Sequence, residues 1–170
     1  MSTRPVLEAD ELCRTYAQRV YRFAAMVARG SPEAEDIAQE ALLKAIRKLD
    51  AYDPRRGSVD TWLWSIVVSA ARDAGRAAGR RLALWDRLTR LPQASESVES
   101  IVLDRLSDAQ LLDAVRKLPS RDRTLIALRF GAGLDHAATG AAVGISAAAA
   151  TMAVRRALHT LRRRLEETHE

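Results

Sequence analysis

The chain contains a single cysteine, Cys13, among its 170 residues, so it forms no intramolecular disulfide and assembles no thiolate metal cluster. A lone cysteine is typical of proteins that work in a reducing compartment. Apolar residues nowhere run for about 18 positions, and the first ten residues lack a signal-peptide pattern. We therefore expect a cytoplasmic protein without membrane insertion.

The chain also lacks the motifs that most enzymes carry. It has no glycine-rich phosphate loop, no histidine-paired nucleophile and no cluster of carboxylates at metal-ligand spacing. His136 has no second histidine or carboxylate at the spacing that a metal site uses. These absences predict a protein with no catalytic residue, no bound metal and no cofactor.

Strands are not expected either, because no segment alternates polar and β-branched residues, whereas apolar residues recur at helical spacing. Ser31 and Ser58 are N-cap candidates for the second and third helices. Three helices with these stripes predict a compact bundle. The stripes are Leu12, Tyr16, Val20, Phe23 and Val27; Ala34, Ala38, Ala41, Leu42, Ala45 and Leu49; and Trp62, Leu63, Ile66, Val67 and Ala70.

A second helical block begins near Ala109, and turn residues around Pro119, Gly131 and Gly144 divide it into four short helices. Between the two blocks the helical pattern weakens from Leu82 to Asp108, and residues 92–97 are polar and have no helical stripe. We place a linker here, with short helices within it as an alternative. The predicted fold is all-α, with two small helical domains at residues 7–82 and 108–168 joined by a linker at 83–107.

The second helix places charged residues on one exposed face. Asp36, Glu40, Lys44 and Lys48 lie four residues apart, with Gln39 beside them. On spacing alone, this face is ordinary ion pairing, in which each pair contributes about 0.3 to 0.5 kcal/mol. A protein contact is the alternative interpretation, and the neighbouring segment favours it.

That segment is a basic turn followed by two tryptophans and a row of arginines. The chain carries 27 Lys and Arg against 22 Asp and Glu, which favours a polyanionic partner. Aromatic side chains stack on unpaired bases while guanidinium groups hold phosphates, so this composition suits single-stranded nucleic acid. Trp62 lies in the apolar stripe, and we expect Trp64 to be the freer of the two tryptophans. The basic residues are Arg55, Arg56, Arg72, Arg76 and Arg80.

These motifs resemble a known family. The segments Glu35-Asp36-Ile37-Ala38-Gln39-Glu40, Asp53-Pro54-Arg55-Arg56-Gly57-Ser58 and Thr61-Trp62-Leu63 are similar to region 2 of the extracytoplasmic-function group of bacterial sigma factors. The second block resembles their region 4, with Leu118-Pro119 and Gly144-Ile145-Ser146 in register.

The resemblance implies that region 2 binds core RNA polymerase and melts the minus-ten promoter element. The residues expected to contact polymerase are Asp36, Gln39, Glu40 and Lys44. The residues expected to contact the melted strand are Arg55, Arg56, Ser58, Trp64, Ser69, Arg72, Arg76 and Arg80. Ser69 departs from the family, which has a base-contacting asparagine there, so one amide capable of bidentate recognition is lost.

Region 4 of the family is a helix-turn-helix that reads the minus-thirty-five element. The reading helix of this chain is depleted of basic residues. The stretch from Phe130 to Val154 contains ten alanines and no Lys or Arg. Ser146 and Thr151 remain as donors, followed by Arg155 and Arg156 for phosphates. Each lost bidentate contact removes about 1 to 3 kcal/mol of discrimination, which predicts weak readout of this element.

The resemblance therefore implies a sigma factor that directs promoter-specific initiation, with core RNA polymerase, promoter DNA and an anti-sigma factor as partners. The depleted region 4 and Ser69 leave an alternative open. A sigma-like regulator would bind polymerase or an anti-sigma partner without starting transcription, or would need a partner to recognise the minus-thirty-five element.

Overall fold

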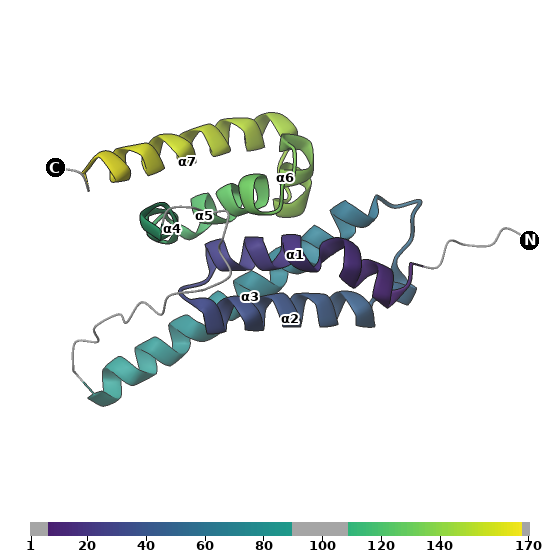
Figure 1. Ribbon diagram of the computed structural model, residues 1–170, viewed down its shortest axis with the longest axis horizontal. Coiled ribbons are helices and arrows are strands. Elements are labelled where there is room, and N and C mark those ends of the chain that lie inside the picture. Colours follow the sequence, from purple (N-terminus) through teal and green to yellow (C-terminus); the bar gives the residue numbers. More distant parts are fainter. Residues whose placement is uncertain (1–6, 90–108, 168–170) are drawn as a thin grey trace, which may run out of the picture.

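The computed structural model describes residues 7–89 and 109–167, which are helical throughout apart from the turns (Figure 1). Within these residues there is no strand, as expected from the sequence. The elements are α1 Ala9–Val27, α2 Ser31–Arg47, the 3-10 turn η1 Leu49–Ala51, α3 Val59–Thr89, α4 Ala109–Arg116, α5 Ser120–Ile126, the π turn η2 Ala127–Gly131, α6 His136–Val143 and α7 Ala147–Glu167.

Local chemistry starts the helices of the N-terminal unit, which comprises α1 to α3. The Oγ of Ser58 accepts a hydrogen bond from the Thr61 N–H at 3.2 Å, which confirms Ser58 as the cap of α3. The prediction for Ser31 is wrong, because Gly30 occupies the N-cap position and makes no side-chain cap. Glu33 in the first turn instead binds the preceding loop, because its Oε2 accepts from the backbone N–H of Arg29 at 2.6 Å.

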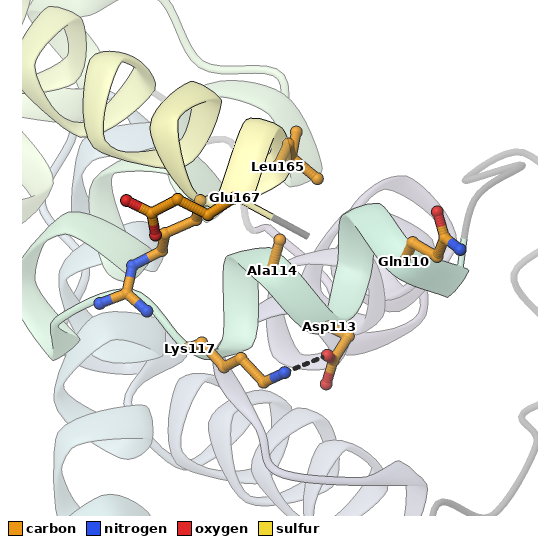
Figure 2. A pocket seen from close by; sticks show the side chains of 7 residues that line it. Gln110, Asp113, Ala114, Lys117, Leu165 and Glu167 are labelled. Atoms are coloured by element: carbon orange, nitrogen blue, oxygen red, sulfur yellow. Dashed lines mark ion pairs between the residues drawn. The ribbon is translucent and has the colours of Figure 1, made fainter. Parts of the chain in front are cut away.

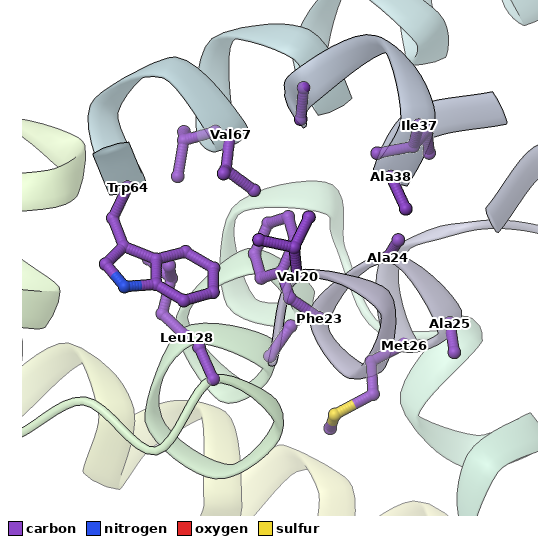
Figure 3. Close-up of a cluster of buried hydrophobic side chains, with 14 of the residues drawn as sticks. Val20, Phe23, Ala24, Ala25, Met26, Ile37, Ala38, Trp64, Val67 and Leu128 are labelled. Atoms are coloured by element: carbon purple, nitrogen blue, oxygen red, sulfur yellow. The ribbon is translucent and has the colours of Figure 1, made fainter. Parts of the chain in front are cut away.

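The C-terminal unit, α4 to α7, packs directly on the N-terminal unit. α4, α5 and η2 lie against α1, while α6 lies against α3 (Figure 1). One continuous core contains residues of both units, among them Val20 and Phe23 of α1 and Leu128 of η2 (Figure 3). The two predicted bundles are therefore not independent bodies on a tether, because each buries apolar surface against the other.

Trp64 lies in this shared core, and the prediction that it is the freer tryptophan is wrong. Its side chain is 0% exposed and meets the Phe23 ring edge-on at a centroid distance of 5.9 Å. The sequence stripe identified one buried face of α3, but the docked C-terminal unit covers a second face. That second face carries Trp64 and Val68, one helical turn apart.

The helix-turn-helix of the C-terminal unit is formed by α6 and α7. Gly144 ends α6 in the left-handed region at φ 80°, which favours glycine. A Cβ on Gly140 would lie 2.6 Å from the Ile145 carbonyl oxygen, so only glycine allows the turn to close this tightly. α7 is 21 residues long, not short as expected from the sequence, because Arg-rich turns extend it beyond the core.

α3 also runs further than expected, to Thr89, so residues 83–89 of the predicted linker are helical. Residues 90–107 of that linker lie outside the described residues. Within the described ranges, no single helix has the length and apolarity to cross a membrane; α6 and α7 reach them only together, with a 96° bend between them.

Candidate nucleic-acid and protein interfaces

The acidic face of α2, defined by Asp36, Gln39 and Glu40, is exposed as its spacing predicted. The Lys44 ammonium group already forms two ion pairs within the chain. Its Nζ lies 3.7 Å from the Glu40 carboxylate and 3.3 Å from the Asp73 carboxylate of α3. The hydrogen bond from Lys44, together with one from Arg76, lowers the pKa of Asp73 below its usual value. Lys44 therefore ties α2 to α3, while the acidic face remains available for a partner.

The basic turn after α2 is held by its own hydrogen bonds. The Tyr52 hydroxyl donates to the Gly57 carbonyl at 3.2 Å, and the Arg55 Nε lies 3.2 Å from the Asp53 carboxylate. Arg56 and Ser58 are exposed beside it. The turn thus presents two guanidinium groups to solvent in a defined backbone conformation.

Trp62, for which the apolar stripe favoured a core position, is partly buried: it packs against the core, and its ring contacts that of Tyr52 at an angle of 46° with centroids 5.2 Å apart. It is therefore the tryptophan of this helix that reaches the surface next to the basic turn. The apolar stripe did not predict this exposure, because Trp62 lies at the edge of the stripe.

The arginine row of α3 is on the surface. Ser69, Arg72, Arg76 and Arg80 are all exposed. Arg76 forms an ion pair with Asp73 on the same helix. Arg72 faces the C-terminal unit and lines a hollow with residues of α5 and α6.

The reading helix α7 offers fewer donors than its sequence suggests. The Thr151 hydroxyl donates to the Ala147 carbonyl at 2.9 Å, so its proton is used within the helix. The Ser146 Oγ accepts from the Ala149 N–H at 3.1 Å and caps α7. Arg155 and Arg156 are exposed one turn further on. The Ser146 proton is consequently the one side-chain donor left near the start of this helix.

Arginines that the sequence did not single out join the two units. Arg19 of α1 donates through Nε to the Ala132 carbonyl at 2.8 Å, and its Nη1 lies 3.5 Å from Asp60. Arg116 of α4 donates to the Ala25 carbonyl from Nε at 3.3 Å and from Nη2 at 3.1 Å. The Arg19–Ala132 and Arg116–Ala25 hydrogen bonds join residues 113 and 91 positions apart, and no local sequence pattern predicts them.

A separate hollow of about 180 Å³ lies between α4 and the end of α7 (Figure 2). Its lining includes the Lys117–Asp113 pair, with an Nζ–Oδ2 distance of 2.6 Å, and none of the predicted site residues. In the described ranges, no three His, Cys, Asp or Glu side chains come together as metal ligands.

Comparison with known proteins assigns both units. Residues 12–81 match the family described as Sigma-70 region 2, and residues 114–163 match Sigma-70, region 4. The chain is 32% identical over 158 residues to the RNA polymerase sigma factor CarQ of Myxococcus xanthus, covering 93% of this chain and 89% of that protein. It is also 32% identical over 164 residues to the ECF RNA polymerase sigma factor BldN of Streptomyces coelicolor. The chain belongs to the extracytoplasmic-function group of sigma-70 factors.

In this chain, helices α1 to α3 correspond to region 2, and helices α4 to α7 contain region 4. The chain spans 62% of the length of BldN, 60% of SigE from Mycolicibacterium smegmatis and 65% of SigD from Mycobacterium bovis. Among solved structures, the sigma factor RpoE in complex with the anti-sigma factor NepR from Bartonella quintana has the same fold. Its TM-score is 0.75 at 21% identity, over 92% of this chain and 96% of that one.

Proposed function

We propose that the chain is a sigma factor that directs core RNA polymerase to specific promoters and melts the minus-ten element. The observation that supports this most directly is the surface of region 2. There the acidic face of α2, the basic turn and the arginine row of α3 are all exposed on one small unit. Catalysis belongs to the polymerase, and this chain supplies binding and positioning.

Within this proposal, Asp36, Gln39, Glu40 and Lys44 contact polymerase. Arg55, Arg56, Ser58, Ser69, Arg72, Arg76 and Arg80 contact the melted strand, with Trp62 in place of the buried Trp64 as the stacking side chain. Ser146, Thr151, Arg155 and Arg156 face the minus-thirty-five element.

An anti-sigma factor is the third partner that we propose. The solved relatives with this fold include RpoE bound to the anti-sigma factor NepR, and CnrH bound to the cytosolic domain of CnrY. The proposed site of action is the cytoplasm, where polymerase and promoter DNA are found.

The proposed function requires the two units to separate. The minus-ten and minus-thirty-five elements are about 25 base pairs apart, or about 85 Å along the duplex. α6 packs on α3 in this structure, so the two DNA-contacting units lie side by side (Figure 1). The closed arrangement therefore represents a resting form, and promoter binding needs an open one.

Gly131→Leu is expected to open the chain. A Cβ at Gly131 would lie 2.8 Å from the Met26 Sδ and 3.3 Å from the Arg22 backbone, so a leucine cannot fit between η2 and α1. The radius of gyration in small-angle scattering should rise by several Å above the about 16 Å of a compact chain of this length. Gly79→Leu is the matched control, because nothing lies within 4 Å of its Cβ position. An unchanged radius for Gly131→Leu would contradict the closed interface.

Run-off transcription with purified core enzyme tests the function itself. A sigma factor yields promoter-dependent transcripts, and changes in the minus-ten element abolish them. Scrambling the minus-thirty-five element should lower the transcript yield by less than about tenfold, because α7 retains one free side-chain donor near its start. Absence of transcripts despite polymerase binding would instead support the second candidate, a regulator that occupies polymerase without initiating; the depleted α7 is the observation that favours it.

A further inference from the structure

A cleft rich in arginine lies between region 2 and region 4. It consists of two adjoining hollows of about 340 and about 460 Å³, which share Arg72, Ser120 and Thr124. Among the lining residues, which all belong to the described part of the chain, Glu33 is the one carboxylate. The lining arginines are Arg29, Arg72, Arg76, Arg121 and Arg123.

Arg123 of α5 carries a charge that its surroundings balance only in part. Burial lowers the pKa of its guanidinium and the positive charge of Arg29 lowers it further, while the Glu33 carboxylate acts in the opposite direction. Its Nη1 donates to the Arg116 carbonyl at 2.7 Å, but its Nε is buried without a hydrogen-bond partner in the described structure. A buried donor without a partner next to a like charge is destabilising, and an anion in the cleft would relieve both costs.

The other arginines of the cleft add to this excess. Neither Arg29 nor Arg72 forms an ion pair with a carboxylate of the described residues. The Glu33 carboxylate accepts from the backbone N–H of Arg29, whereas Arg76 is paired with Asp73. In the described part of the chain, the hollow of about 340 Å³ is therefore lined by three guanidinium groups that lack a carboxylate ion pair, those of Arg29, Arg72 and Arg123, and by a single acid, Glu33.

We propose that this cleft binds a small polyanion with two or more phosphate groups, held between α3 and α5. Guanidinium groups bind phosphate oxygens in pairs of parallel hydrogen bonds, and several of them at one site favour a ligand with several phosphates. Hollows of these volumes match small-molecule sites. A DNA duplex, whose major groove alone is about 12 Å wide, is too broad to enter them.

The bound polyanion would join region 2 to region 4. Since Arg72 and Arg76 belong to α3 and Arg121 and Arg123 to α5, the ligand stabilises the closed form and withholds two arginines from promoter DNA. Binding itself is independent of the proposed function. Only its consequence for promoter DNA rests on that function.

Titration calorimetry of the full chain with sodium triphosphate tests the site, with ionic strength held constant by sodium chloride. We expect saturable one-to-one binding that ATP reproduces and inorganic phosphate does not. Arg72→Gln should weaken triphosphate binding about tenfold, the loss of one charge-assisted contact. Arg80→Gln removes the same charge from the same row outside the cleft, and should change binding less than about twofold in physiological salt.

Arg29→Gln provides a second variant, in the turn between α1 and α2, with the same expected loss. Equal losses in Arg72→Gln and Arg80→Gln, or heats that do not saturate, would overturn the proposal in favour of diffuse charge attraction. Equal affinity for inorganic phosphate would overturn the polyphosphate assignment. Triphosphate binding in a chain that fails run-off transcription would leave the site standing and remove the proposed function.

Discussion

Reversing the charge of Asp36 and Glu40 together, by Asp36→Arg and Glu40→Arg, is expected to remove binding to core RNA polymerase. Truncating one partner of a charge pair that becomes buried in an interface costs about 2 to 5 kcal/mol. Two reversals together should therefore weaken binding by roughly a thousandfold or more. A pull-down of core enzyme with the tagged chain measures this directly.

The same double variant should fold normally, because both side chains are exposed on α2. Surface substitutions of this kind change the free energy of unfolding by about 0.5 kcal/mol or less. Glu11→Arg is the control: it reverses an exposed acid on α1, outside the acidic face of α2. Retained polymerase binding in the double variant would show that this face is ordinary ion pairing.

Trp64→Ala is expected to lower the free energy of unfolding by about 3 to 5 kcal/mol, the range for removing a large buried aromatic side chain. Trp64 is fully buried, meets Phe23 edge-on and lies in the core that both units share. Its loss should weaken both region 2 and the docking of region 4. Urea denaturation should give a lower midpoint.

Two further tryptophan variants separate packing from hydrogen bonding. Trp64→Phe keeps an aromatic ring and removes the indole Nε1, which is buried without a partner in the described residues, so it should cost much less than alanine. Trp62→Ala removes a half-buried ring and should cost less than Trp64→Ala as well. A larger loss for Trp62→Ala would contradict the burial of these two side chains.

Much of the local structure follows from the sequence, because helix periodicity and capping depend on residues only a few positions apart. The apolar stripes predicted α1, α2 and α3, and Ser58 predicted the start of α3. The same spacing predicted that the acidic face of α2 and the arginine row of α3 are exposed. The internal bond of Thr151 was not predicted, although a threonine four residues after a helical carbonyl commonly makes it.

The sequence by itself determined that this protein is helical, that it belongs to a family of sigma factors, and that the acidic face of α2 and the arginine row of α3 are exposed. Only the tertiary structure decided that the two units share one core and that Trp64 is buried while Trp62 reaches the surface. It also decided that five arginines meet in one cleft. The physical reason is distance along the chain: contacts such as Arg19 with Ala132 and Arg116 with Ala25 join residues 113 and 91 positions apart. Local periodicity carries no information about such pairs, because they form only when apolar surface on one unit is buried against the other.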